Sequence, residues 1–388
     1  MRVALAHDYL LRFGGAERVL QVLHEMFPDA PIYTLLWDES RMRQFFPNAK
    51  IRTSSLERAP GFLKKSPRRL LPFIPIAVEG MDFSGYDLVI SSSSAFIKGI
   101  VTRSHSVHIS YCHAPSRFLW EWTHEYLKER PPHIVVRPFV TLLLNYLRMW
   151  DVNAAARVDS FVANSQFTAS RILKYYRAPA RVVYPPVRAV MRAASHHAVP
   201  SGEFFLIVSQ LVPAKKLDIA VQAFRKLEVP LVIIGDGPER DKLARLAGKS
   251  TVFMGRLGDE ATDAFFAASS AFVFSGEDDF GIAPVEAMLH GKPVLALRRG
   301  GARETVVEGR TGEFFDAPDV ETLADGVRRL RENIRAGKYD PESIRAHAEQ
   351  YSKAAFIEGI QAAIRDAYEQ GGVSLFESLP DGTIESGV

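Results

Sequence analysis

The sequence predicts an α/β protein with two doubly wound domains. Short apolar runs alternate with longer segments of helical periodicity, and this alternation is typical of parallel sheets covered by helices. The alternation stops in residues 188–202, which are small, polar and without clear periodicity, and it restarts at Phe204. Several runs end in glycine-rich or polar turns, where sheets of this kind bind ligands. We therefore expect a first domain over 1–187, a linker over 188–202, a second domain over 203–351, a helix over 352–370 and a frayed tail over 371–388.

In the first half, buried strands are expected where short apolar runs meet polar turns. These runs are 3–6, 32–37, 86–90, 107–111, 161–165 and 181–184. Helical periodicity follows Gly15 and also fills 138–156. Ser165 is a suitable N-cap for a further helix through Tyr176, because its hydroxyl can accept a hydrogen bond from a free N–H group.

The second half repeats the order of strand and helix from Phe204 onward. The expected strands are 204–209, 231–234, 271–274 and 293–297, with 252–255 continuing the alternation. Helices are expected over 217–227 and 259–268, and helical periodicity continues from the turn at Gly300 to about Gln370. The turn 235–238, Gly-Asp-Gly-Pro, is interpreted as structural.

Composition limits the class of protein. At 388 residues the chain is long enough for two domains with a sizeable core. Hydrophobic residues make up 47% and charged residues 24%, which excludes wholesale disorder. The net charge of +3 is too small to indicate a nucleic-acid partner, and none is expected.

Cellular location is inferred from the single cysteine and from the absence of targeting patterns. Cys112 alone excludes internal disulfides and fits a reducing compartment. The N-terminus enters strand-like sequence at once, without the apolar core of a signal peptide, and no apolar run approaches the ~20 residues of a membrane span. We expect a cytoplasmic protein.

The stretch 271–291 carries the strongest functional pattern. A predicted strand over 271–274 is followed by three acids, then Phe280-Gly281, then a helix with Pro284 expected at its first position. Gly281 lets the backbone approach a ligand, and a helix start offers free N–H groups to an anion. Carboxylates beside an anion site suit sugar hydroxyls. The alternative is that Glu286 only complements the helix dipole and the other acids only cap a loop.

Other turns have features that suit phosphate binding. Glycine pairs precede helices at Gly14-Gly15 and Gly300-Gly301, and Lys215-Lys216 stands at the start of a helix, where an anion would relieve the unfavourable interaction of cations with the dipole. A solvated surface pair is the alternative for the lysines. The chain lacks the Gly-x-Gly-x-x-Gly spacing and later acid of a dinucleotide fold, which argues against a dehydrogenase.

Three motifs carry a resemblance to a known family. They are 14–18, Gly-Gly-Ala-Glu-Arg; 111–117, Tyr-Cys-His-Ala-Pro-Ser-Arg; and 278–286, in which Asp278 precedes Phe280-Gly281 and four residues separate Gly281 from Glu286. Together they resemble the retaining GT-B glycosyltransferases of the family-four group, which includes bacterial polysaccharide mannosyltransferases. Asp278 stands where the family usually has Glu, and Gln210 stands where it usually has Arg.

The resemblance implies two Rossmann-like domains facing a cleft, with the donor bound mainly by the second and the acceptor by the first. In the family the first acid of the signature contacts the donor sugar and the second the nucleotide ribose. Carried over, the implied catalytic residues are His113, Asp278 and Glu286. The implied donor-binding residues are Gly14, Gly15, Gln210, Lys215, Lys216, Asp279, Phe280, Gly281, Ile282, Gly300 and Gly301, and the implied acceptor-binding residues are His7 and Arg117.

The implied reaction is transfer of a sugar from a nucleotide diphosphate donor to a glycan or lipid-linked acceptor, with retained configuration. Resemblance favours GDP-mannose over UDP- or dTDP-linked sugars. No cofactor is expected, and no metal, because Asp278-Asp279 has no further ligand at suitable spacing and Cys112 is interpreted as packing. A sugar-nucleotide epimerase of the same fold and an inactive member of an assembly complex remain alternatives.

Residues 62–73 carry four basic residues, no acids and five large apolar ones. An anionic membrane surface is one interpretation, since each basic residue contributes ~1 kcal/mol near such a surface. It would attach the protein to the inner face of the cytoplasmic membrane. A solvated loop with scattered core anchors is the other interpretation, and Pro67, Pro72 and Pro75 exclude a long helix here.

Overall fold

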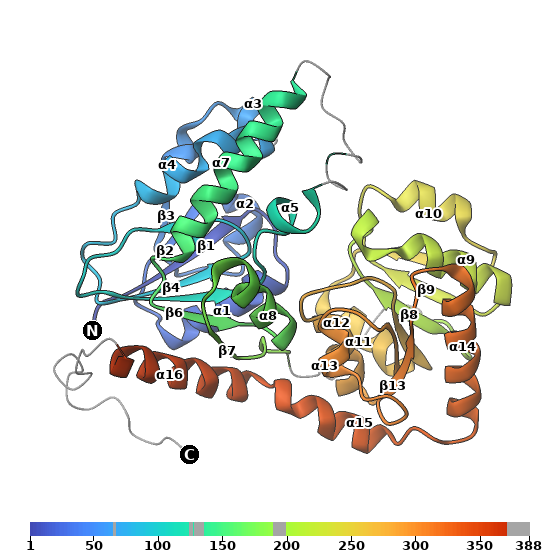
Figure 1. Ribbon diagram of the computed structural model, residues 1–388. Helices are drawn as coiled ribbons and strands as arrows, with labels where there is room; N and C mark the ends of the chain where they lie inside the picture. The colour runs from blue at the N-terminus through green and yellow to red at the C-terminus, as the bar shows by residue number, and fades with distance from the viewer. Residues whose placement is uncertain (65–66, 124–126, 128–135, 189–198, 371–388) are drawn as a thin grey trace. The chain divides into compact units, whose positions relative to one another are not determined.

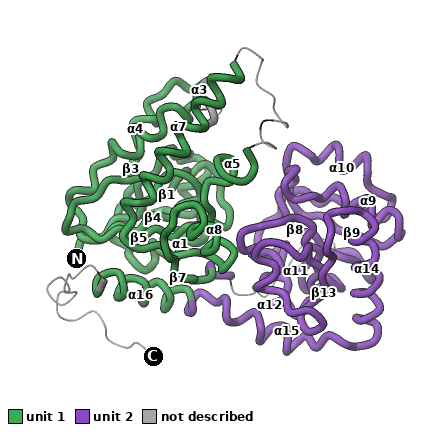
Figure 2. Tube along the Cα trace, in the orientation of Figure 1, with its two compact units in different colours: residues 1–184, 356–388 green, residues 185–355 purple. Residues whose placement is uncertain are grey.

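The computed structural model describes residues 1–64, 67–123, 127, 136–188 and 199–370 (Figure 1). The chain divides into two compact units (Figure 2). Unit 1 contains residues 1–184 together with 356–388, and unit 2 contains residues 185–355. The domain boundaries expected at 187 and 351 thus fall near, but not at, the divisions between the two units. The expected linker starts with Arg188, which belongs to unit 2.

Each unit is built on a parallel sheet, so the predicted α/β class with two Rossmann-like domains is confirmed. The order in unit 1 is β3-β2-β1-β4-β5-β6-β7, and in unit 2 it is β10-β9-β8-β11-β12-β13. The strands of unit 1 are β1 Val3–Leu10, β2 Ile32–Trp37, β3 Ile51–Thr53, β4 Leu88–Ser93, β5 Val107–Cys112, β6 Ser160–Ala163 and β7 Ala180–Val182. Those of unit 2 are β8 Phe205–Val208, β9 Leu231–Ile234, β10 Thr251–Gly255, β11 Ala271–Phe274, β12 Val294–Leu297 and β13 Gly312–Phe315.

Helices connect these strands. In unit 1 they are α1 Gly15–Met26, α2 Glu39–Met42, η1 Ser55–Arg58, α3 Gly61–Lys64, η2 Pro67–Phe73, α4 Ile74–Glu79, η3 Ile97–Gly99, α5 Arg117–Trp120, α7 Arg137–Ala155, α8 Gln166–Tyr176 and α16 Lys353–Gln370. In unit 2 they are η4 Pro213–Lys215, α9 Leu217–Leu227, α10 Arg240–Leu246, α11 Asp259–Ala268, α12 Ile282–Leu289, α13 Ala302–Thr305, α14 Val320–Arg335, α15 Pro341–Ala348 and η5 Glu349–Tyr351.

In both sheets the order reverses between two neighbouring strands, β1 and β4 in unit 1 and β8 and β11 in unit 2. Crossovers to either side of this point place helices on both faces of a sheet. In unit 1 the two faces are visible in the alternation along β1, where Leu5 joins the apolar cluster under α1 and α16 while Ala4 and Ala6 join the cluster under α4 and α7. In sheets of this kind, ligands bind at the carboxyl ends of the strands beside such a reversal.

Three expectations need correction. The sequence interpretation missed β3 and β13, and the helical periodicity after Gly300 is interrupted by β13. Glu313 breaks the apolar run of β13, yet it is buried because its carboxylate accepts hydrogen bonds from Tyr339 and Asn333, both at 2.7 Å. Helix α12 begins at Ile282, so Pro284 is not its first residue. As expected from its prolines, 61–79 forms the short helices α3, η2 and α4.

Candidate functional site

In unit 1, the carboxyl ends of β1, β4 and β5 hold a chain of four polar side chains. His7 and Ser92 are register partners in adjacent strands. The hydroxyl of Ser92 lies 3.1 Å from Nδ1 of His7 and 2.8 Å from Nε2 of His113, and Nε2 of His7 lies 3.4 Å from the Glu17 carboxylate. A serine hydroxyl has one proton, so it can donate to only one of the two rings. At least one ring therefore donates its N–H to Ser92.

His113 is held in place by its backbone as well as its ring. Its N–H group donates to the carbonyl of Ser93 at 2.8 Å, and its own carbonyl accepts from the side-chain amide of Asn164 at 3.0 Å. Burial, and then the neighbouring His7, lower the pKa of His113 to about 3. The ring is therefore neutral at physiological pH and acts through hydrogen bonds rather than through charge.

Gly14 makes room for the carboxylate in this chain. Its φ of −158° is extended backbone that any residue can adopt, so its conformation does not require glycine. A Cβ at this position, however, would lie 3.2 Å from Oε2 of Glu17. Gly15 follows as the first residue of α1. The absence of a side chain at Gly14 thus leaves space for the Glu17 carboxylate. The expected contact of Gly14 and Gly15 with a donor stays a prediction.

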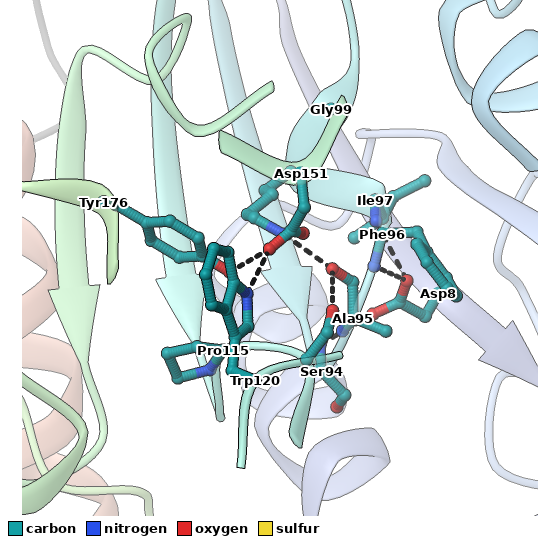
Figure 3. A network of polar contacts seen from close by, with 12 residues as sticks. Asp8, Ser94, Ala95, Phe96, Ile97, Gly99, Pro115, Trp120, Asp151 and Tyr176 are labelled. Atoms are coloured by element: carbon teal, nitrogen blue, oxygen red, sulfur yellow. Dashed lines mark hydrogen bonds and ion pairs between the residues drawn. The ribbon is translucent and has the colours of Figure 1, made fainter. Parts of the chain in front are cut away.

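A second network holds the loop after β4 (Figure 3). The buried carboxylate of Asp8 accepts hydrogen bonds from four consecutive backbone N–H groups, those of residues 94–97, at 2.6 to 2.9 Å. On the other side, buried Lys98 pairs with buried Asp151, which also accepts from Trp120 and Tyr176, both at 2.8 Å. Because the charged groups and N–H groups of this network have hydrogen-bond partners, the network holds the loop after β4 in place.

Arg117, expected at the acceptor site, is the first residue of α5, and its guanidinium lies 4.6 Å from the centroid of the Trp122 ring. Cys112 is buried beside Phe161, Ala163 and Ile172, which agrees with its interpretation as packing. Among the residues that the structure describes, no group of three or more His, Cys, Asp or Glu could hold a metal ion.

In unit 2, the two residues expected to act on different parts of a donor are paired with each other. Nζ of Lys215, at the end of η4, lies 2.5 Å from the carboxylate of Asp278, in the loop after β11. Both side chains are about a quarter exposed, at 24% and 26%. The two loops also meet through the Ser275 hydroxyl, which donates to the Lys215 carbonyl at 3.0 Å. An exposed pair of this kind can exchange its partners for a ligand at low cost.

Gly300 and Gly301 support the acidic loop from the other side. A Cβ on Gly300 would lie 2.3 Å from the Asp278 carbonyl, and a Cβ on Gly301 would lie 2.4 Å from Cα of Phe280. Gly301 also donates its N–H to the Asp278 carbonyl at 2.9 Å. The glycines are thus required for close backbone packing, whatever contact they make with a ligand.

Glu286, on α12, is held by an arginine that sequence reasoning assigned to the linker. Nε of Arg188 lies 3.1 Å from Glu286, and its other two nitrogens bind both oxygens of Asp263 at 2.6 and 2.5 Å. His290 also contacts Asp263, at 3.1 Å. Burial lowers the pKa of Arg188, but its hydrogen bonds to Asp263 and the charge of Glu286 outweigh burial and raise the pKa above its usual value. No local motif marks Arg188, so only its position in the fold identifies it.

The remaining expected donor residues lie in or directly after the loops that follow β8 and β11. Gln210 and Lys216 are exposed, and Lys216 adopts a left-handed φ of 51° as the N-cap of α9. Phe280 is buried and packs edge-on against Tyr351 at 5.5 Å, so its ring belongs to the core. Gly281 has a φ of 87°, a conformation that favours glycine, and precedes Ile282 at the start of α12. Asp279 lies between these residues and Asp278.

These two doubly wound units, with polar groups at the carboxyl ends of both sheets, define a two-domain α/β protein. Comparison with known families identifies it further. Residues 13–189 match the model of Glycosyltransferase Family 4, and residues 193–353 match the model of Glycosyl transferases group 1. The chain therefore belongs to the glycosyltransferases of group 1 and family 4, whose models match its second and first halves. This confirms the family-level part of the resemblance.

Curated relatives share parts of this chain. It is 32% identical over 164 residues to a GDP-mannose-dependent α-(1-6)-phosphatidylinositol monomannoside mannosyltransferase of Mycolicibacterium smegmatis, covering 38% of this chain and 42% of that protein. It is 32% identical over 194 residues to a D-rhamnosyltransferase of Pseudomonas aeruginosa, covering 45% and 51%. The matches thus span about half the length of these relatives or less.

Solved structures support the GT-B fold. The chain superposes on Anabaena HepE in complex with UDP-glucose with a TM-score of 0.68 at 19% identity, covering 94% of this chain and all of that one. For sucrose-phosphate synthase from Thermosynechococcus elongatus the TM-score is 0.70 at 14% identity, covering 95% and 100%. At these identities the likeness concerns the fold alone. Within the described residues, no helix has the length and apolarity needed to cross a membrane.

Proposed function

We propose that this protein is a retaining glycosyltransferase that moves a sugar from a nucleotide diphosphate donor to a glycan or lipid-linked acceptor. One observation carries the proposal: glycosyltransferase family models match both halves of the chain, and the second match contains Asp278 and Glu286 at the spacing of the family signature. The other implied residues are proposals of the same kind.

In the proposed reaction, the bond between the anomeric carbon and the β-phosphate oxygen breaks, and the acceptor oxygen bonds to the same face of that carbon. The acceptor proton passes to the leaving phosphate. Negative charge develops on the diphosphate as its bond breaks, so cations placed beforehand, Lys215 and Lys216, would stabilise it. Asp278 would accept hydrogen bonds from the sugar and Glu286 from the ribose. His113, a neutral ring, would accept or donate a hydrogen bond at the sugar.

The pair between Lys215 and Asp278 fits this proposal. A lysine held 2.5 Å from a carboxylate is oriented and remains partly exposed. An incoming diphosphate would attract the ammonium, and the released carboxylate would be free to accept sugar hydroxyls. Binding of the diphosphate by Lys215 would then be linked to binding of the sugar by Asp278, because separating the pair frees both side chains.

GDP-mannose is the proposed donor. GDP-mannose-dependent enzymes of Mycolicibacterium smegmatis are 32% and 39% identical to this chain over their matched segments. UDP- or dTDP-linked sugars are the alternative, since a structural neighbour was crystallised with UDP-glucose. Calorimetry with GDP, UDP and dTDP distinguishes them. Tighter binding of UDP than of GDP would exclude mannose transfer from GDP while leaving the glycosyltransferase proposal intact.

The reaction itself is tested by incubating the protein with labelled donors and a bacterial membrane extract. Label transferred to the extract supports the proposal. Epimerised donor without transfer would instead identify an epimerase, and binding without either product would identify an inactive member of an assembly complex. No cofactor is part of the proposal.

Attachment to the inner face of the cytoplasmic membrane also remains a proposal. Of residues 62–73, Arg69 is exposed and Phe73 is 53% exposed, which suits a surface contact. Leu70, however, is buried in the unit 1 core, and residues 65–66 lie outside the described residues. Part of this segment therefore anchors the core, as the loop interpretation expected.

A further inference from the structure

Helix α7 of unit 1 has an apolar face on each side. Its inner face buries Leu144, Leu147 and Trp150 in the core. Its outer face exposes large apolar side chains at spacings of three and four residues, which places them on one side of the helix. They are Phe139 (70% exposed), Leu142 (69%), Tyr146 (45%) and Met149 (57%). A surface helix of a soluble protein normally carries polar residues on its outer face. The outer face of α7 does not follow this pattern.

Exposed apolar side chains are concentrated in this part of the described chain. Val152 of α7 and its N-cap residue Val136 are also exposed, as are Phe73 at the end of η2 and Ile76 of α4. Helix α4, which carries Ile76, covers the same core cluster as α7, and Trp150 of α7 donates to Glu79 of α4 at 2.8 Å. Figure 1 shows α4 and α7 next to each other. Exposed apolar side chains gathered on neighbouring helices indicate an interaction site.

The described charged residues of η2, and those of α7 before Asp151, are positive: Arg69 and Arg137 are exposed and Arg148 is half-buried. The acid of α4, Glu79, is paired with Arg157 at 2.8 Å. The first acid of α7, Asp151, is buried and paired with Lys98. A second copy of the chain is a poor occupant, because a symmetric contact would bring these like charges together. An anionic surface with an apolar interior satisfies both features.

We propose that the outer face of α7, with Ile76 and Phe73, is the docking surface of this protein for an anionic lipid bilayer. The helix would lie in the plane of the interface, with Phe139, Leu142 and Met149 in the acyl region and Arg137 at the headgroups. Tyr146 has an apolar ring and a polar tip, which suits the boundary. The proposal does not depend on sugar transfer, since an inactive protein would dock in the same way.

The test measures sedimentation of the full chain with phosphatidylglycerol-containing vesicles, without donor or acceptor. We expect the wild type to bind, and a Leu142→Gln/Met149→Gln variant to bind at least tenfold more weakly with an unchanged melting temperature. Leu173→Gln is the matched control, because Leu173 is 56% exposed on α8, away from this face, and should bind like the wild type. Arg137→Gln should weaken binding mainly at low salt.

The docking proposal would be overturned by failure of the wild type to sediment with anionic vesicles, or by equal binding of the double variant. A wild-type dimer in solution that the double variant converts to a monomer would also overturn it, since the face would then belong to a second copy.

A second inference rests on the hydrogen-bond chain at the end of the unit 1 sheet. A carboxylate only accepts, so Glu17 requires the proton of His7 on Nε2, the atom that faces it. Nδ1 of a neutral His7 is then an acceptor, and Ser92 must donate to it. The Ser92 oxygen is left to accept from Nε2–H of His113. We infer that Glu17 and Ser92 are positioning residues that fix His113 as the Nε2–H tautomer, with Nδ1 as its acceptor.

This inference uses the proposed function only to say what the acceptor would bind, a hydroxyl of the donor sugar. Nitrogen-15 NMR of the ligand-free protein tests it directly. We expect the unprotonated-type signal at Nδ1 of His113 in the wild type, and a mixture of tautomers in Ser92→Ala. Ser91→Ala is the matched control, because Ser91 contacts Nε2 of His108 at 2.8 Å and should alter only that ring.

A wild-type signal for protonated Nδ1, or a tautomer unchanged in Ser92→Ala, would overturn the inference without bearing on glycosyl transfer. If transfer occurs, Ser92→Ala should lower kcat and leave the affinity for free nucleotide unchanged, and Ser92→Thr should restore part of kcat.

Discussion

The carboxyl ends of the two sheets are built from different interactions. In unit 1, Glu17, His7, Ser92 and His113 form a hydrogen-bonded chain whose His113 ring is neutral. In unit 2, ion pairs dominate, with Lys215 on Asp278 and Arg188 on Asp263 and Glu286. Buried hydrogen bonds fix geometry, whereas charged groups near the surface can attract a charged ligand and change partners. The first end is thus suited to orienting a neutral group, and the second to binding an anion.

The two ion pairs of unit 2 also differ from each other. Arg188 and Asp263 are largely withdrawn from water, at 15% and 2% exposure, and their contact is bidentate. Lys215 and Asp278 are partly exposed and joined through a single ammonium. Breaking the first pair leaves the Arg188 guanidinium with Glu286 but without its bidentate partner in a poorly solvated site, while breaking the second returns both groups to water.

The largest expected effect follows from removing Asp263. Asp263→Ala leaves the Arg188 guanidinium without its bidentate partner, and we expect the free energy of unfolding to fall by ~3–5 kcal/mol. Chemical denaturation measures this. Glu308→Ala is the control, because its pair with Arg298 is exposed and should change stability by less than ~1 kcal/mol. Equal effects of the two variants would contradict the distinction between buried and exposed pairs.

Glu286→Ala should remove a charged hydrogen bond to the proposed ribose, which is worth ~1.5–3 kcal/mol, or roughly a ten- to hundredfold loss of kcat/KM. Arg188 keeps Asp263 as a partner in this variant, so the fold should persist. Transfer assays and a melting curve together test the role. Normal turnover and donor affinity in a folded variant would assign Glu286 to structure alone.

The histidines His108 and His113 of unit 1 predict a pH dependence of stability. Burial lowers the pKa of both His108 and His113 to about 3, below the unfolded value of 6.5. The unfolded chain therefore binds these protons more readily. The stabilisation is complete above pH 6.5 and is lost as the pH falls toward about 3, at up to ~1.4 kcal/mol per pH unit for each ring.

Denaturation between pH 7 and 5 measures this slope. His113→Gln should reduce it, while His105→Gln, at an exposed position, should leave it unchanged. A slope that His113→Gln does not alter would mean that the ring is not buried in solution.

The smallest effect on stability is expected for the pair of Lys215 and Asp278, at ~0–1 kcal/mol. Its effect on binding should be clearer. Lys215→Ala should weaken binding of a nucleoside diphosphate more than that of the nucleoside, whereas Asp278→Asn should strengthen it by freeing the lysine. Asp278→Glu should retain transfer and Asp278→Asn should not. If calorimetry finds weaker diphosphate binding in Asp278→Asn, the proposed exchange of partners is wrong.

Sequence reasoning was most accurate where local pattern determines structure. The strands Leu231–Ile234 and Ala271–Phe274 and the helices Leu217–Leu227 and Asp259–Ala268 begin and end where periodicity predicts. It failed at β13, because Glu313 breaks the apolar pattern and is satisfied by partners distant in sequence.

The candidate site also has features that local sequence pattern predicts and features that it misses. Motif spacing identifies Asp278 and Glu286, but the partners of these acids, Lys215 and Arg188, lie 63 and 98 residues away in sequence. Ser92 has no distinguishing signal among four consecutive serines, 91–94, and only the register of β1 against β4 brings it to His7. Pairings that depend on the folded sheet cannot be deduced from spacing.

Helix α16 has a consequence for biosynthesis. Its residues Phe356, Ile360 and Tyr368 lie in the same apolar cluster as Leu5 and Tyr111, so unit 1 needs segments from both ends of its sequence. Unit 2, residues 185–355, is continuous and leaves the ribosome before α16 does. A nascent chain that ends near residue 352 should therefore hold a protease-resistant second unit and a first unit still open along the α16 side. Pulse proteolysis of stalled chains would detect this order, and the interval is when a chaperone would have an apolar surface to bind.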